Sequence, residues 1–261
     1  MKIVETEGLP EDRGLRLGPR DTFAFACHEQ LDCFNQCCRN LNLFLYPYDV
    51  LRLKNRLGMT AGDFIDTHVE LVLREGNHFP EVMLAMADNP EKTCPFLTAS
   101  GCSVYADRSY SCRLFPVEEA VSYEAATNGG STSLYFFRPP DFCRGGEAPR
   151  RLTPEQWIAD QQAQRYVELT RQWGRIKALF ADDPWQSEGP YGPRAKMAFM
   201  AAYNVDDFRD FVFQSSFLKR FKVKAAVLKK LRASDVELML FGWQWLRFYV
   251  WNMPSTQFRM K

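Results

Sequence analysis

The sequence predicts an α-rich α+β protein: a cysteine-cluster domain with short strands and a hairpin, followed by a helical C-terminal half. Three observations support this fold class. All eight cysteines lie between Cys27 and Cys143, and the rest of the chain has none. Short apolar runs separated by Gly, Pro and Asn dominate the first half, as is typical of strands and turns. The second half repeats apolar residues at spacings of three and four, as amphipathic helices do.

The cysteine distribution also predicts the domain organisation. We expect an N-terminal extension over 1–20, a cysteine-cluster metal-binding domain over 21–150, and a helical region over 151–261 packed on it. Gly145-Gly146 and Pro149 favour a connector at the second boundary.

The elements of the first half follow from local patterns. Alternation predicts a strand at 41–45, and a second strand is expected at 82–87. A helix should begin with Asp49 as its N-cap and stop at Gly58. Another should begin at Thr60, where Thr-x-x-Asp resembles a capping box.

A hairpin is the strongest short-range signal in the chain. Apolar arms at 117–125 and 132–137 flank Asn128-Gly129-Gly130, residues that tolerate positive φ. Because the arms have similar lengths, we expect the hairpin to bring Cys143 beside Cys112.

The second half reads as a series of helices. Thr153-Pro154-Glu155-Gln156 combines an N-cap, a proline at the first helical position and a capping-box glutamine. An apolar stripe runs from Tyr166 to Phe180, and 189–193 is a Gly/Pro-rich break. Further helices are expected over 194–203, 205–214, 217–231 and 235–251.

Composition excludes several functional classes. The net charge of +1 gives no global attraction for nucleic acid or an anionic membrane. No apolar run reaches the roughly 18 residues of a membrane span, and the N-terminus lacks the apolar core of a signal peptide. We therefore expect a cytoplasmic protein with no membrane and no nucleic-acid partner. We expect its chemistry to depend on its cysteine thiols.

The cysteines form two groups and one isolated residue, and metal binding explains them best. The first group has the pattern C-x5-C-x3-C-C, and the second has C-x7-C-x9-C. Disulfides would need an oxidising compartment, a redox pair would favour C-x-x-C, and free buried cysteines are rarely this dense. Neighbouring side chains such as Cys37 and Cys38 point in different directions, so they rarely bind one tetrahedral ion. If both bind metal, we expect a multinuclear cluster or two nearby sites. The candidate ligands are Cys27, Cys33, Cys37, Cys38, Cys94, Cys102, Cys112 and Cys143.

A longer signature surrounds these cysteines. It runs from Cys33-Phe34-Asn35-Gln36-Cys37-Cys38-Arg39 through Cys94-Pro95-Phe96-Leu97 and Gly101-Cys102-Ser103-Val104-Tyr105 to Cys112-Arg113-Leu114-Phe115-Pro116. With this signature, roughly residues 24–143 resemble the YkgJ-like cysteine-cluster family, the CxxCxxCC zinc- or iron-chelating domain. The first group departs from the family pattern, since C-x5-C-x3-CC replaces C-x2-C-x2-CC. The resemblance implies chelation of zinc or iron. The thiolates could also hold an iron–sulfur cluster. A distantly similar cysteine pattern in flagellin lysine N-methylases keeps an enzymatic reading open.

Basic residues mark two further candidate features. Arg39, Arg108 and Arg113 adjoin cysteines and could donate hydrogen bonds to an anionic thiolate cofactor site. The acid-free run 219–232 predicts an amphipathic helix whose basic face could bind a protein partner. Three functions therefore stay open: a metal-chelating protein, a cluster-dependent protein-modifying enzyme whose catalytic residues the sequence does not name, and an interaction module stapled by a structural metal.

Overall fold

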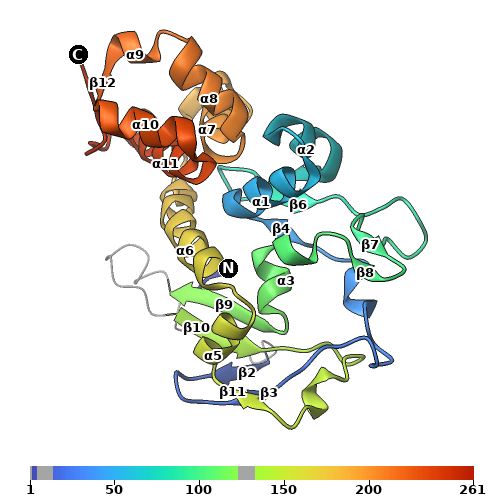
Figure 1. Ribbon diagram of the computed structural model, residues 1–261. Coiled ribbons are helices and arrows are strands. Elements are labelled where there is room, and N and C mark those ends of the chain that lie inside the picture. The colour runs from blue at the N-terminus through green and yellow to red at the C-terminus, as the bar shows by residue number, and fades with distance from the viewer. Residues whose placement is uncertain (1, 5–13, 123–132) are drawn as a thin grey trace. The chain divides into compact units, whose positions relative to one another are not determined.

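The computed structural model of the chain describes residues 2–4, 14–122 and 133–261 (Figure 1). The predicted α-rich α+β class is confirmed. The chain divides into two compact units, both built from separate stretches of sequence. The cysteine unit comprises residues 1–44 and 84–178, and the helical unit comprises 45–83 and 179–261.

A four-stranded sheet in the order β1-β9-β10-β2 lies in the cysteine unit. The arms of the predicted hairpin are confirmed, because β9 and β10 pair antiparallel with Val117 opposite Phe137 and Ser133 opposite Val121. The predicted turn at 128–130 lies outside the described residues. The four strands are β1 (Lys2–Val4), β2 (Leu15–Leu17), β9 (Val117–Ser122) and β10 (Ser133–Phe137).

Among its described residues, the cysteine unit also contains two small ribbons and three helices. β3 (Phe23–Ala24) pairs with β11 (Arg151–Leu152), and β7 (Leu97–Thr98) pairs with β8 (Gly101–Cys102). The expected capping box at Thr153 begins a helix, which ends at Asp160; Gln162, just beyond it, has a positive φ of 51°. The helices are α3 (Tyr110–Leu114), α5 (Pro154–Asp160) and α6 (Gln164–Ala178).

Aromatic packing forms a core under the ribbon of β3 and β11. Trp157 lies 5.5 Å from Phe25 and 5.9 Å from Phe23 between ring centroids, both in edge-on geometry. The Trp157 indole also donates to the Leu114 carbonyl at 2.9 Å, so its one polar atom is satisfied. Cys143 packs against this core. The cluster thereby fixes a cysteine-bearing loop to the sheet.

A buried carboxylate joins the sheet to α3 and α6. Glu119 on β9 accepts hydrogen bonds from Tyr110 and from Ser133, and forms an ion pair with Arg171 at 2.6 Å. Arg171 also donates to the Tyr135 hydroxyl at 2.7 Å. Because each charged group has several partners, the unit carries this ion pair without an unsatisfied charge.

The helical unit begins with two helices whose ends follow local chemistry. Gly58 ends the first helix in the left-handed conformation with φ 68°, as predicted. Asp49 is not the N-cap, however; it occupies the third helical position and accepts from the Tyr46 amide at 2.9 Å. Thr60 caps the second helix by accepting from the Asp63 amide at 3.1 Å. These helices are α1 (Pro47–Leu57) and α2 (Ala61–His68).

Three short strands accompany these helices, in the order β4-β6-β5. The strands expected at 41–45 and 82–87 are both shorter than predicted. They are β4 (Phe44–Leu45), β5 (Val69–Val72) and β6 (Glu81–Leu84).

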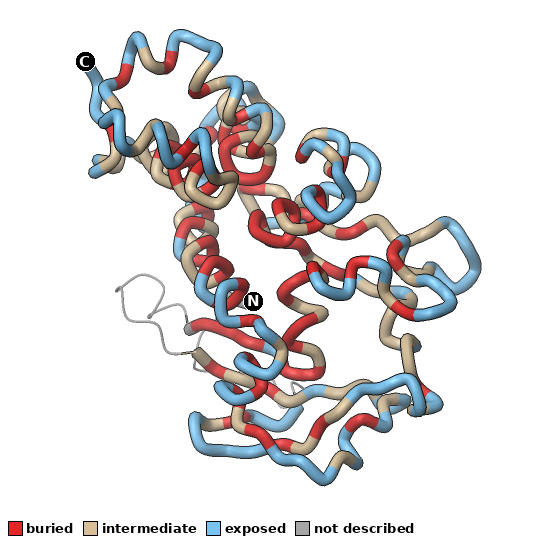
Figure 2. Tube along the Cα trace, viewed as in Figure 1, coloured by how far each residue is buried: buried red, intermediate tan, exposed pale blue. Residues whose placement is uncertain are grey.

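The C-terminal helices pack against one long helix. Figure 2 shows buried residues along these helices. Gly242 of α11 lies so close to α7 that an added Cβ would clash with the Ala201 carbonyl and lie 3.2 Å from the Phe208 ring. Lys54 of α1 is buried and pairs with Asp206 at 3.1 Å and Asp235 at 3.3 Å, linking α1 to α8 and α11. These helices are α7 (Pro193–Tyr203), α8 (Val205–Gln214) and α11 (Asp235–Trp251).

The basic run is not the single helix expected over 217–231. Helix α9 (Phe217–Arg220) gives way to strand β12 (Phe221–Val223), and α10 (Ala225–Ala233) follows. The break is explained by β13 (Phe258–Met260), which pairs antiparallel with β12 and places Arg259 opposite Lys222.

Candidate metal centre

The first cysteine group lies on a chain of tight turns after β3. Backbone amides of Leu31, Phe34 and Gln36 each donate to the carbonyl three residues earlier, at 2.8–3.2 Å. Asn35 has a positive φ of 64°, a conformation that asparagine tolerates better than most residues. It leads into a 3₁₀ turn, Gln36–Cys38. Successive turns thus fold the segment that carries Cys33, Cys37 and Cys38 into a compact loop.

The second group is tied to the first by backbone hydrogen bonds. The Cys94 amide donates to the Cys38 carbonyl at 2.8 Å. The β7–β8 ribbon then folds back and places Cys102 opposite Leu97. Cys112 lies on α3, whose N-cap Ser109 accepts from the Cys112 amide at 3.4 Å.

Cys143 joins the first group and not the second, which corrects its predicted position beside Cys112. Its thiol forms a hydrogen bond with Cys33 and interacts electrostatically with Cys37. The hairpin register alone would have continued toward Cys112, but the ladder ends with the Arg138 amide donating to the Pro116 carbonyl. Pro139 and Pro140 follow and have no amide hydrogen, so the two arms part there.

Cys37 and Cys38 interact with each other and with thiols of both cysteine groups. Burial, followed by the Cys37, Cys33 and Cys143 thiolates, raises the pKa of Cys27 to about 11. The Cys38 thiol hydrogen-bonds to Cys37, and this contact lowers the pKa of Cys37 to about 7. The same hydrogen bond, with burial and the charges of Cys112 and Cys94, raises the pKa of Cys38.

In the second group, burial and hydrogen-bond donors shift the thiol pKa values in opposite directions. Burial raises the pKa of Cys112 to about 12, against a hydrogen bond from Ser109 that lowers it. Burial also raises the pKa values of Cys94 and Cys102. Backbone amides oppose this effect, from Phe96 and Leu97 at Cys94 and from Val104 at Cys102.

Amide donors to sulfur are also present in the first group. The Arg144 amide donates to the Cys33 sulfur at 3.2 Å, and the Gly145 amide donates to the Cys143 sulfur. Such donors favour the anionic thiolate, the form that binds metal. The sequence analysis did not identify these donors, nor Ser109, because they act through backbone atoms or a common cap residue.

The three candidate arginines differ in what they contact. The Arg108 guanidinium interacts electrostatically with Cys112 and Cys102, donates to Gln161 Oε1 at 2.7 Å and lies over the Tyr105 ring. Arg39 lowers the pKa of Cys37 and pairs with Glu91 at 3.2 Å. The Arg113 side chain donates instead to the carbonyls of Arg108, Ala106 and Gln161, so its role in the structure is to connect backbone segments.

The thiols lie in the same unit, but their side chains do not point to a common metal position in the described residues. Within the part of the chain that the structure describes, no three His, Cys, Asp or Glu side chains are arranged to hold a metal ion. All eight cysteines are described, and all are free. Binding a metal through this set would therefore require the thiol–thiol hydrogen bonds at Cys37–Cys38 and Cys33–Cys143 to be replaced by bonds to the metal.

Comparison with known families agrees with this site. Residues 26–144 match the CxxCxxCC family model, described as a "putative zinc- or iron-chelating domain". The segment that holds all eight cysteines thus matches the cysteine-cluster family that it resembles in sequence, and the resemblance is confirmed over these residues. No curated protein and no solved structure matches the chain. In the described residues, no helix has both the length and the apolar character needed to cross a bilayer.

Proposed function

We propose that the protein holds a tightly bound zinc or iron through the cysteines of the cysteine unit, and that this metal stabilises the unit. The observation that carries the proposal is the assembly of all eight thiols, from separate segments, into one network of hydrogen-bonded and electrostatically coupled groups. Thiolate is a ligand for both zinc and iron, including iron–sulfur clusters. The metal ion is the partner that this donor set fits.

The environment of the sulfurs fits a metal better than it fits disulfides. Amide donors point at Cys33, Cys94, Cys102 and Cys143, and the Arg108 charge lies near the second group. All of these favour thiolate, whereas a disulfide carries no charge for them to stabilise. Free thiols at this density also agree with a reducing compartment, and so with the cytoplasm.

Metal analysis of protein purified without oxygen tests the proposal. We expect at least one equivalent of zinc or iron per chain, resistant to dialysis against a weak chelator. The absorption spectrum separates the candidates, since zinc thiolate is colourless in the visible range and iron thiolate or an iron–sulfur cluster is not. Metal-free protein with equal stability and eight freely titratable thiols would overturn the proposal.

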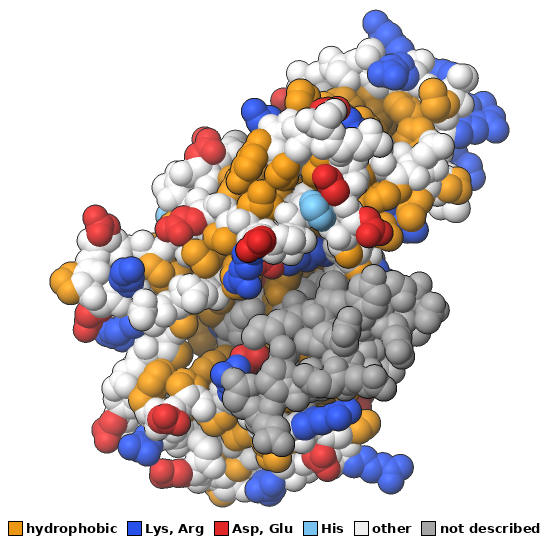
Figure 3. Space-filling model, turned by 180° about the vertical axis from the view of Figure 1, so that it is seen from behind, with side chains coloured by type: hydrophobic (Ala, Val, Ile, Leu, Met, Phe, Trp, Pro, Cys, Tyr) orange, Lys and Arg blue, Asp and Glu red, His pale blue; other side chains and the backbone are white. Residues whose placement is uncertain are grey.

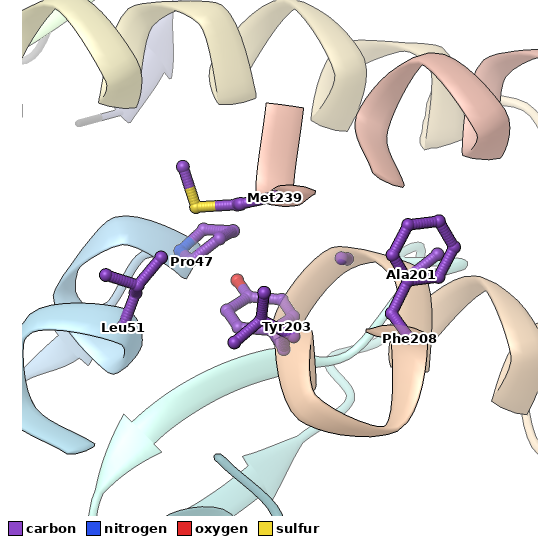
Figure 4. Close-up of a pocket in the computed structure, with 8 residues that line it drawn as sticks. Pro47, Leu51, Ala201, Tyr203, Phe208 and Met239 are labelled. Carbon is purple, nitrogen blue, oxygen red and sulfur yellow. The ribbon is translucent and has the colours of Figure 1, made fainter. Parts of the chain in front are cut away.

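An enzymatic role has less support from the structure. A small hollow lies in the helical unit among α1, α7, α8 and α11, and the side chains that line it are mostly apolar (Figure 4). Its one polar side-chain group is the Tyr203 hydroxyl, which donates to the Leu45 carbonyl at 3.5 Å. This pocket supplies neither an acid–base pair nor a nucleophile. The cluster-dependent methylase reading thus rests on the distant cysteine pattern alone.

A second function is favoured by the basic segment of the helical unit. Ten Lys and Arg but only two Asp and Glu fall in residues 211–261, although the whole chain carries only +1. Lys and Arg side chains gather over the C-terminal end of the chain in Figure 3. We propose that this surface binds an acidic protein partner, because charge complementarity steers association. Replacing Lys222, Lys224 and Lys229 by Glu should abolish capture of an acidic partner and leave metal content unchanged.

A further inference from the structure

The eight thiols separate into two sets of four, each held by its own backbone connections. Building on the proposed function, we propose that they form two four-thiolate metal sites, with the adjacent residues Cys37 and Cys38 serving different sites. The ligand class is a thiophilic divalent ion such as Zn²⁺, which takes four thiolates in tetrahedral sites. The first site comprises Cys27, Cys33, Cys37 and Cys143, and the second comprises Cys38, Cys94, Cys102 and Cys112.

Close backbone approach assembles the first site. The Ala26 amide donates to the Gly145 carbonyl at 3.0 Å. An added Cβ at Gly145 would clash with the Phe25 ring and lie 2.7 Å from the Ala26 carbonyl, so only glycine allows this approach. One residue earlier, the Arg144 amide donates to the Cys33 sulfur at 3.2 Å. The loop that carries Cys143 is thereby fixed beside both Cys27 and Cys33.

A different set of connections assembles the second site. The Cys94 amide bonds to the Cys38 carbonyl, and the β7–β8 ribbon returns Cys102 to the same turn. Arg113, the neighbour of Cys112 on α3, donates to the Arg108 carbonyl at 3.2 Å and to the Ala106 carbonyl. These bonds hold α3 against the segment that follows Cys102.

The thiols that interact with Cys37 and with Cys38 favour a different site for each residue. Apart from its neighbour, Cys38 interacts with Cys112 and Cys94, both of the second set. Cys37 interacts with Cys27 and Cys143 of the first set, although its charge also reaches Cys94 and Cys112. Cys37 is thus the fourth thiol within reach of the first set, and Cys38 completes the second.

Each site also has one nearby arginine. Arg39 interacts with Cys37, and Arg108 interacts with Cys102 and Cys112. A divalent ion bound by four thiolates keeps a net negative charge, which a neighbouring guanidinium stabilises. The presence of one arginine near each set of four thiols therefore agrees with two separate sites.

Paired substitutions in the full chain test the division. Protein is loaded with Zn²⁺, passed through a desalting column and analysed for bound zinc. We expect two equivalents in the wild type and one in Cys27→Ser, Cys37→Ser, Cys38→Ser and Cys102→Ser. The double variant Cys27→Ser/Cys37→Ser should keep one equivalent because both residues belong to one site. The matched variant Cys27→Ser/Cys38→Ser should keep none, although the second substitution moves by only one residue.

The outcomes separate this inference from the proposed function. Wild-type protein without bound metal would contradict the proposed function itself. One zinc per chain, loss of both equivalents in a single variant, or equal zinc content in the two double variants would contradict the two-site division alone. Should variants misfold, titration of wild-type protein with Co²⁺ decides the matter: two sites predict thiolate-to-cobalt absorption that rises until two equivalents are added, and saturation at one would overturn the inference.

Discussion

At the scale of single residues, the cysteines combine raised pKa values with donors that favour the thiolate. Burial keeps Cys94, Cys102 and Cys112 protonated at neutral pH, while amides and Ser109 stand ready to stabilise their anions. A metal must therefore displace protons from these thiols. The site is arranged so that ionisation is favoured mainly when a metal is present to accept the charge.

This arrangement predicts pH-dependent metal affinity. Binding a metal displaces a proton from each thiol that is protonated in the metal-free protein, as burial favours at Cys94, Cys102 and Cys112. Lowering the pH therefore strengthens the competition of protons with the metal. Affinity should be greatest at alkaline pH and fall by at least about tenfold for each unit of acidification below about pH 8. Competition with a chromogenic chelator across this range measures the slope. A flat profile, after correction for the chelator's own protonation, would contradict the proposed thiolate ligation.

Arg108 offers a second prediction at this scale. Arg108→Gln removes a cation that interacts with Cys112 and Cys102, and should weaken metal binding by about tenfold or more. The control is Arg150→Gln. Arg150 pairs on the surface with Asp160 at 2.7 Å, and in the described part of the chain no interaction joins it to a thiol. Chelator competition compares the two variants. Equal affinities would remove Arg108 from the environment of the site.

At the scale of elements, Glu119 connects four parts of the cysteine unit. Glu119→Ala leaves Arg171 without its carboxylate partner and removes the acceptor for Tyr110 and Ser133. We expect a loss of about 3 kcal/mol or more in the free energy of unfolding, because breaking a buried ion pair costs that much. Thermal or urea unfolding of the metal-loaded protein measures it.

The matched control is Glu168→Ala on α6. Its partner Arg165 is exposed and only three residues away, so the change should cost less than about 0.5 kcal/mol. A Glu119 variant as stable as this control would show that the buried network contributes little.

Local sequence chemistry predicted the helix ends well, and non-local pairing explains where it failed. The Thr153 capping box, the Gly58 stop and the α11 boundaries all depend on residues adjacent in sequence. The basic run was interrupted by β13, a strand that lies more than thirty residues later. In the same way, the position of Cys143 depended on where the β9–β10 ladder ends, and the hairpin turn signal does not contain that information.

The sequence names the candidate ligands of the site but does not show how they group. Cysteine density and the family signature supplied all eight candidate ligands, which stay proposals. The directions of neighbouring side chains already suggested two nearby sites at Cys37 and Cys38. Which thiols lie together, however, depends on backbone contacts such as that of Ala26 with Gly145, which join segments more than a hundred residues apart.

At the scale of the whole molecule, the two compact units predict an uneven response to metal removal. All eight cysteines belong to the cysteine unit, and the helical unit has its own buried core around α11. Stripping metal with a strong chelator should raise amide hydrogen exchange in 14–44 and 84–122 while 193–251 keeps its protection, since metal binding free energy is coupled to folding. Hydrogen exchange read by mass spectrometry resolves these segments. Uniform loss of protection would mean that the units unfold together.

The chain passes between the two units three times, after residues 44, 83 and 178. The segment that matches the family, 26–144, therefore includes 45–83, which belongs to the other unit, and omits α5 and α6, which pack in the cysteine unit. A gene fragment cut at the family boundaries would lack Trp157, the anchor of the aromatic core, and Arg171, the partner of Glu119. The segment that matches the family is consequently not expected to fold by itself. Recombination or truncation that respects only the cysteine motif would separate it from the residues on which its architecture depends.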